Sequence, residues 1–208
     1  MLSRPELKQQ AREILRGKWT QPVLAALIVT LVTGFTQGGS QTQSPTFITL
    51  GTLVALLIAE NLQYGFSVGM LRFRRGRENT ISEMISAGFK EDYGRVLGIM
   101  LLATLFIILW CLLLIIPGII KAYAYTMAPY IAEDNPELGP RECLQRSEAM
   151  MYGHKMDLFI LHLSYIGWIL LGILTLGIGL LWVMPWMEMA QVKFYEELKA
   201  ENGNNSIQ

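Results

Sequence analysis

Long apolar runs alternate with short polar segments along most of the chain. The central run, WCLLLIIPGIIKAYAYTMAPYIAED at positions 110–134, is interrupted by Pro117 and Gly118. Proline lacks a backbone N–H and glycine tolerates left-handed backbone angles, so this pair predicts a tight reversal between two helices. The flanking runs hold too many apolar residues for a soluble hairpin, and they predict a helical hairpin in a membrane.

The other apolar runs extend this pattern to six predicted transmembrane helices. The last block, residues 158–183, would be about 39 Å long as one helix, which exceeds a hydrocarbon core of about 30 Å. Its glycines break it, so two helices with a turn near residues 175–179 are expected, and Pro185 falls inside the second as a hinge. The predicted spans are residues 20–36, 47–71, 96–116, from the central turn to 131, 157–174 and 179–196.

A short amphipathic segment precedes each pair of predicted spans. Residues 5–19 place their apolar side chains on one helical stripe. Thr80 and Glu83 form a capping box ahead of a second such helix, and a third begins at Pro140. This shared plan favours a threefold repeat within one all-α membrane domain of residues 1–208, although any array of membrane hairpins has a similar pattern. The repeats would be residues 1–77, 78–134 and 135–200, followed by a flexible tail at 201–208.

The position of the charges is more informative than their sum. The chain has 17 Lys and Arg and 17 Asp and Glu, a formal net charge of zero, so no overall field favours a nucleic acid partner. With both termini in the cytoplasm, every Lys and Arg except Lys121 falls on that side, and the three outer turns carry no charge. Five spans would move Lys193 and Lys199 outside, so the positive-inside rule favours six.

Several stretches resemble a known family. They are RPELKQQAREILRGKW near the start, WCLLLIIPGIIKAYAYTMAPYIAEDNPELGPRECLQRSEAMMYGHKMDLFILHLSYIGW in the centre and TLGIGLLWVMPWMEMAQVKFYEEL near the end. They are similar to the small bacterial integral membrane proteins grouped as domain of unknown function 975. The resemblance implies a multi-span protein of the bacterial cytoplasmic membrane, with no established activity and no catalytic residues. The central pattern is also similar to the membrane domain attached to some glycerophosphodiester phosphodiesterases.

A few polar residues fall inside the predicted spans: Glu60, Asn61, Lys121, His162 and Glu188. An unpaired charge at the bilayer centre costs roughly 3 kcal/mol or more, so each charge predicts a partner or water. Glu60 and Glu188 should lie about 12–18 Å deep and Lys121 about 6 Å deep. Glu60 is expected to face the bundle interior with Asn61 or Lys121 nearby, as a structural contact or a transport site. For His162 there are two alternatives, a hydrogen bond to a neighbouring helix and a role in a proton relay.

No enzyme motif fits its predicted context. Residues 65–69 match G-x-S-x-G, but they lie in an apolar helix, where small residues let helices pack closely. The two cysteines are interpreted as free thiols, and no spacing typical of a metal or cofactor site occurs. We therefore predict a non-enzymatic protein without a cofactor. An enzyme acting on lipid would need a cytoplasmic cleft containing His154 or the acidic run at 133–137.

The expected role is that of an accessory protein acting through membrane lipids or through a membrane protein partner, a second copy of the chain included. Four arginines after the second span are expected to meet anionic headgroups: Arg72, Arg74, Arg75 and Arg77. The alternative is a transporter of a small solute or lipid that uses Glu60, Lys121 and Glu188, with the prolines as hinges.

Overall fold

The computed structural model is all-helical over the residues it describes, which confirms the all-α prediction. It describes residues 3–38, 45–76, 81–90, 93–175 and 177–205, apart from the side chains of residues 33–38, 45–57, 85, 88, 90, 113 and 203–205. The helices are α1 Arg4–Leu15, α2 Thr20–Gly38, α3 Pro45–Arg74, α4 Ile81–Lys90, α5 Tyr93–Leu113, α6 Ile115–Tyr125, α7 Ala128–Asp134, α8 Pro140–Met150, α9 Lys155–Leu163, α10 Ile166–Leu174 and α11 Leu180–Asn205.

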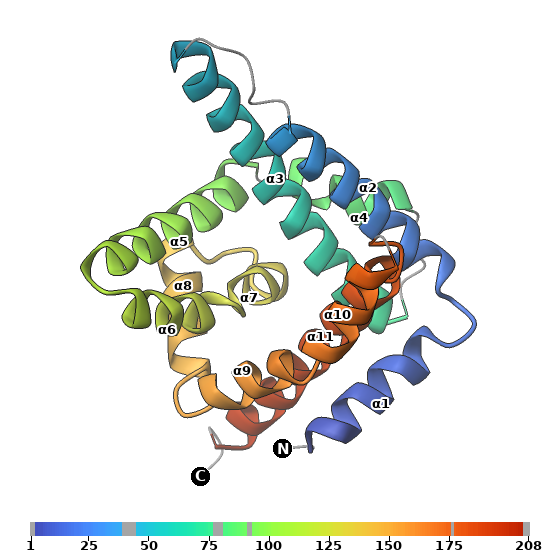
Figure 1. Cartoon of the computed structure of the whole chain (residues 1–208). Helices are drawn as coiled ribbons and strands as arrows, with labels where there is room; N and C mark the ends of the chain where they lie inside the picture. The colour runs from blue at the N-terminus through green and yellow to red at the C-terminus, as the bar shows by residue number, and fades with distance from the viewer. Residues whose placement is uncertain (1–2, 39–44, 77–80, 91–92, 176, 206–208) are drawn as a thin grey trace.

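Three pairs of consecutive helices pack against each other: α2 with α3, α5 with α6, and α10 with α11. Figure 1 shows α7 near the middle of the molecule, with the α5–α6 pair to its left, the α2–α3 pair to its upper right and the α10–α11 pair to its lower right. The short helices α1 and α4 directly precede the first two pairs, whereas α9 lies between α8 and the α10–α11 pair. The threefold repeat stays a prediction.

The short helices bury one face each, as their apolar patterns predict. α1 begins after a capping box, in which the Ser3 N–H donates to the Glu6 carboxylate at 2.7 Å. The capping box predicted at Thr80 lies outside the described residues. The buried residues are Leu7, Ala11 and Leu15 in α1, Met84 and Ala87 in α4, and Cys143, Leu144 and Ser147 in α8.

The reversal between α5 and α6 lies just ahead of the predicted one. Leu114 is extended, with φ −159° and ψ 136°, and α6 begins at Ile115, so Pro117 and Gly118 fall in its first turn. Proline is accepted there because the N–H groups of a first turn have no intrahelical acceptor. Gly118 serves packing instead, since a Cβ there would lie 2.9 Å from the Cα of Cys111. The turn predicted at Pro117 and Gly118 is thus wrong in position.

The turn between α10 and α11 lies at residues 175–179, where the sequence predicts it. Gly177 adopts φ +85°, and the Thr175 hydroxyl accepts a hydrogen bond from the Gly179 N–H at 3.0 Å. Pro185 lies inside α11 and cannot donate to the carbonyl of Leu181. Because α11 continues to Asn205, helix replaces most of the tail predicted at 201–208.

Two predicted spans contain a helix break that the sequence pattern did not reveal. The first separates α6 from α7, where the Ser147 hydroxyl donates to the Ala124 carbonyl at 2.7 Å and accepts from the Met127 N–H at 3.2 Å. The second separates α9 from α10, where the Lys8 ammonium donates to the Ser164 carbonyl at 2.7 Å. Polar side chains from other helices therefore bind the backbone at both breaks.

Among the described residues, two helical segments have the length and apolar composition needed to cross a membrane. They are Tyr93–Leu112 and Lys155–Leu174, and a shorter apolar helix covers Thr20–Val32. This supports an association with membrane, while the six spans stay a prediction.

Candidate functional site

The N-terminal helix α1 packs on α11, and its basic side chains also reach α9 and the break between α9 and α10. The Arg4 guanidinium pairs with Asp157 at 3.3 Å, near the start of α9. One turn further on, the Lys8 ammonium reaches the Ser164 carbonyl and lies 4.2 Å from the ring centroid of Tyr165. The Trp186 indole N–H donates to the Lys8 carbonyl at 2.9 Å, which ties α1 to α11 as well.

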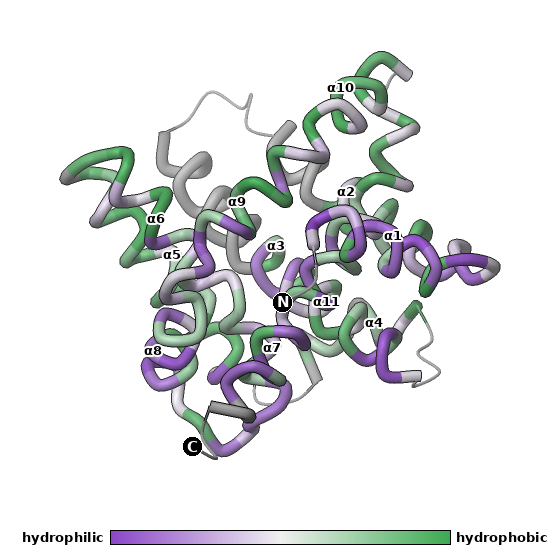
Figure 2. The backbone as a smooth tube through the Cα atoms, turned by 90° about the horizontal axis from the view of Figure 1, so that it is seen from below, coloured by the Kyte–Doolittle hydropathy of each residue, from purple (hydrophilic) through white to green (hydrophobic). Residues whose placement is uncertain are grey.

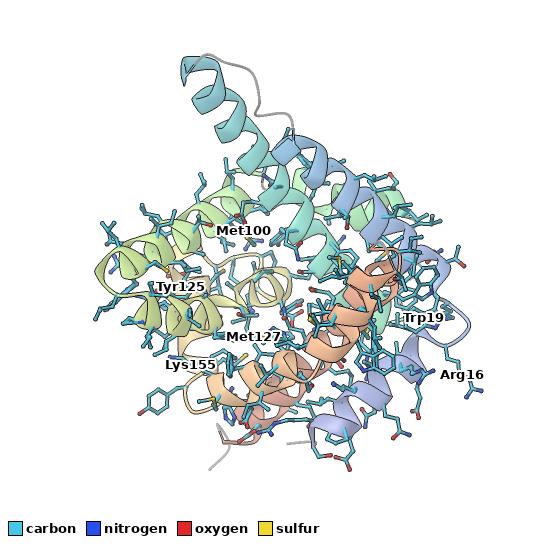
Figure 3. The ribbon with its side chains drawn as sticks, viewed as in Figure 1. Arg16, Trp19, Met100, Tyr125, Met127 and Lys155 are labelled. Atoms are coloured by element: carbon cyan, nitrogen blue, oxygen red, sulfur yellow. The ribbon has the colours of Figure 1, made fainter. Side chains whose placement is uncertain are left out.

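Beyond Lys8, residues of α1, α10 and α11, together with Trp19, line an open cavity of about 500 Å³. Arg12 is the one charged residue in the described lining. Gly172 and Gly179 let α10 and α11 approach closely, since a Cβ at Gly179 would lie 2.9 Å from the Cα of Gly172. Figure 3 marks this end of α1 by Arg16 and Trp19. The aromatic wall is formed by Trp19, Trp168, Trp182 and Trp186.

A second cavity of about 290 Å³ lies among α3, α5, α6, α7 and α11. Glu60 lines it, as the prediction of an inward-facing Glu60 requires, and accepts a hydrogen bond from the Thr104 hydroxyl at 3.4 Å. The neighbouring Asn61 is fully buried. Met100 and Tyr125, which are also in the lining, are labelled in Figure 3. The lining residues with polar groups are Glu60, Gln63, Tyr64, Ser67, Thr104, Tyr125, Thr126 and Gln191.

Glu188 lies at one end of a chain of hydrogen bonds between helices. It accepts from the Tyr130 hydroxyl at 2.7 Å, and Tyr130 accepts from the Gln191 amide at 3.0 Å. Gln191 bonds His162 Nε2 at 3.2 Å, and His162 Nδ1 lies 3.4 Å from the Tyr123 hydroxyl. The Gln191 amide in the middle does not titrate, which disfavours a proton relay along this chain. These bonds join α6, α7, α9 and α11, as expected for a histidine bound to a neighbouring helix.

Lys121 is paired with Glu148 of α8 rather than with Glu60. Its ammonium lies 2.5 Å from the Glu148 carboxylate and 5.5 Å from the ring centroid of Trp110. The structure thus separates the charged groups that the sequence suggested as neighbours: Glu60 faces a cavity, and Lys121 joins α6 to α8.

The arginines at the end of α3 bind acidic side chains of the same chain. Arg72 makes a bidentate pair with Glu133 at 2.7 and 2.9 Å, Arg75 pairs with Asp134, and Arg74 lies 3.3 Å from Glu196. Their contact with headgroups stays a prediction, since protein carboxylates occupy these guanidinium groups. Arg77 lies outside the described residues.

Asp134 is the centre of this ion-pair cluster. It also accepts hydrogen bonds from the Tyr195 hydroxyl at 2.8 Å and the Lys199 ammonium at 2.5 Å. Burial acts to raise the pKa of Asp134, but the bonds from Arg75, Lys199 and Tyr195 outweigh it and hold that pKa well below its usual range. Glu133 and Asp134 of the acidic run therefore anchor α7 to α3 and α11.

Comparison with known protein families places the chain. The family described as "Protein of unknown function (DUF975)" matches residues 1–121 and 111–202, which together cover nearly all of it. The chain belongs to the DUF975 family. No curated protein and no solved structure matches it.

The sequence of this DUF975 chain did not predict the contact of Arg95 with the end of α7. The Arg95 guanidinium donates to the carbonyls of Ala132, Asn135 and Leu138 at 3.1–3.2 Å, and so binds the C-terminal end of α7. Its only signal was a basic residue at the start of a predicted span.

The sequence also did not predict the tryptophan cavity, because its walls come from both ends of the chain.

Among the described residues, no three His, Cys, Asp or Glu side chains lie close enough to hold a metal ion. Both cysteines, Cys111 and Cys143, are free thiols, as predicted.

Proposed function

We propose that this DUF975 protein is a non-enzymatic protein of the bacterial cytoplasmic membrane that binds phospholipid and acts as an accessory factor. Its helical pairs would lie in the bilayer, with both termini and the Arg72–Glu133 and Arg75–Asp134 pairs on the cytoplasmic side. The observation that carries this proposal is the tryptophan-lined cavity beside Arg12.

The chemistry of this cavity fits the boundary between water and lipid. Indole rings favour the headgroup level, where an apolar ring and a polar N–H are both accommodated. A guanidinium binds phosphate with two parallel hydrogen bonds, and Arg12 is exposed on α1. An acyl chain against the rings and a phosphate at Arg12 would satisfy both features at once.

Native mass spectrometry of gently extracted protein tests this function. The wild type should retain one phospholipid, and Arg12→Gln should lose most of it, because a neutral amide does not hold the phosphate. Arg16→Gln is the matched control, since Arg16 is exposed on the same helix but does not line the cavity, and it should retain the lipid. Equal retention by Arg12→Gln and the wild type would refute the site. A stoichiometric protein partner without lipid would support an accessory role through protein contacts instead.

A small-solute transporter is the second candidate, favoured by the 290 Å³ cavity at Glu60. A carboxylate beside hydroxyl and amide groups suits a small cation. Ser67 of the lining also bonds Glu188, so the cavity adjoins both carboxylates. Uptake of tetramethylammonium into proteoliposomes should then require Glu60 and be lost in Glu60→Gln but not in Glu13→Gln, an exposed control on α1. No uptake above protein-free vesicles would remove this candidate for organic cations.

A further inference from the structure

We infer that the tryptophan-lined cavity selects phospholipids whose headgroup carries a negative charge and no amino group, such as phosphatidylglycerol. This selectivity rests on the phospholipid-binding role proposed above, and it names the class of lipid that the cavity takes. It follows from three properties of the described lining: a cation that no carboxylate neutralises, polar groups that donate hydrogen bonds, and an apolar wall.

The charge of Arg12 is not neutralised within the described part of the chain. No side-chain hydrogen bond or ion pair of Arg12 occurs among these residues, and the lining that they form contains no Asp or Glu. Glu13, its neighbour on α1, lies outside the lining and accepts from the Gln9 amide at 2.9 Å. By contrast, Arg4 on the same helix pairs with Asp157. The charge of Arg12 is therefore available to an anion from outside the chain.

The polar groups of the cavity are donors. An indole N–H can only donate a hydrogen bond, and the same holds for a guanidinium. The one hydroxyl in the described lining, that of Thr175, is engaged within the turn between α10 and α11. It donates to the Gly172 carbonyl at 2.8 Å and accepts from the Gly179 N–H at 3.0 Å. The oxygens of a phosphodiester anion only accept hydrogen bonds, so this group suits the lining.

An amino headgroup does not fit the same lining. An ammonium has three N–H donors and no acceptor, and it finds no carboxylate among the described lining residues. It would also lie within reach of the Arg12 guanidinium, and like charges repel. A glycerol headgroup carries no cation and avoids both costs. Phosphatidylethanolamine is therefore expected to bind less well than phosphatidylglycerol with the same acyl chains.

The arrangement of the rings also disfavours a choline headgroup. Tryptophans hold a quaternary ammonium through open ring faces. Here Trp168 and Trp186 meet edge to face, with 5.5 Å between ring centroids and 70° between ring planes. Trp186 meets the Tyr165 ring in the same way, at 5.1 Å and 86°. These aromatic neighbours cover ring faces that a cage for choline would need, so phosphatidylcholine is the less suitable ligand.

The apolar wall favours a lipid over a free phosphate ester. In Figure 2, α1 is mainly hydrophilic and α10 mainly hydrophobic, so the cavity has one polar and one apolar wall. Acyl chains would bury apolar surface against α10 and α11, whereas a soluble phosphate ester would gain only the contact with Arg12. The lining residues of these two helices recur at helical spacing: Trp168, Leu171 and Gly172 in α10, and Trp182, Val183 and Trp186 in α11.

Lipid competition tests the selectivity. The full chain is reconstituted in vesicles with equal amounts of phosphatidylglycerol, phosphatidylethanolamine and phosphatidylcholine of identical acyl chains, and is then extracted gently for native mass spectrometry. The lipid retained by the wild type should be enriched about fivefold in phosphatidylglycerol, the ratio expected for one ion pair at a water-exposed site. A large excess of sn-glycerol 3-phosphate should not displace it. Displacement would assign the site to a soluble phosphate ester and overturn the inference.

Arg12→Glu is the informative variant, because it places an acceptor carboxylate where the donor stood, at an exposed position that leaves the core unchanged. Its bound phosphatidylglycerol should fall about fivefold or more, whether or not phosphatidylethanolamine replaces it. Arg16→Glu is the matched control. It makes the same change of charge on α1 outside the lining, and it should keep the wild-type preference. An equal loss in both variants would assign the preference to the overall charge of α1 and overturn the inference.

The outcomes for the wild type keep the two proposals separate. Protein that retains no lipid contradicts the phospholipid-binding role itself. Protein that retains the three lipids equally, or that prefers phosphatidylethanolamine or phosphatidylcholine, contradicts only the selectivity for an anionic headgroup without an amino group.

Discussion

The hydroxyl of Ser147 supports the backbone of two other helices. It donates to the Ala124 carbonyl and accepts from the Met127 N–H, at the break between α6 and α7. Ser147→Ala leaves both backbone groups without this partner in a buried site, which should cost about 1–3 kcal/mol of stability. Thermal unfolding in detergent measures the loss. Ser164→Ala is the control, because that exposed hydroxyl bonds only a carbonyl of its own helix, and its melting temperature should stay near wild type.

Asp134 gives the fold a defined dependence on pH. Its pKa in the folded chain is held below the value of about 3.9 found in an unfolded chain, so its ion pairs stabilise the fold fully above that pH. The stabilisation is lost as the pH falls toward the folded pKa. Asp134→Asn should therefore lower the melting temperature most at pH 7, and the difference from wild type should shrink below about pH 4. A difference that does not change with pH would argue against the ionised pair.

At the scale of elements, the pairing of α5 with α6 depends on one small residue. A Cβ at Gly118 would lie 2.9 Å from the Cα of Cys111, a distance that forces the helices apart. We expect Gly118→Ala to destabilise the protein by about 1–3 kcal/mol. Gly167→Ala in α10 is the control, because no atom lies within 4 Å of its added Cβ, and alanine there should be neutral or stabilising. Equal melting temperatures for both variants would contradict the close packing.

The elements themselves were predictable to different degrees. Apolar runs and caps locate α1, α2, α8 and the α10–α11 turn well, because helix formation there depends on nearby residues. The reversal at Leu114 was missed, since a Pro-Gly pair also fits a first helical turn. The partners of Arg72, Lys121 and Glu188 were missed because each lies on a distant helix, and spacing along one segment carries no information about such contacts.

At the scale of the whole molecule, large apolar side chains stay exposed at the ends of two hairpins. They include Leu112 and Ile116 on either side of Leu114, and Leu174 just before the α10–α11 turn. Apolar surface of this extent is typical of a protein that contacts a membrane or a partner.

We therefore expect protein made by cell-free synthesis to bind phospholipid vesicles, with co-flotation as the measure of the bound fraction. Leu112→Lys with Ile116→Lys is the informative variant, because two charges at the α5–α6 tip oppose burial in hydrocarbon while their exposed positions leave the core unchanged. It should bind the vesicles less than the wild type does. Equal binding by the two proteins would show that the α5–α6 tip does not enter the hydrocarbon, and wild-type protein that does not float with the vesicles would contradict the membrane role.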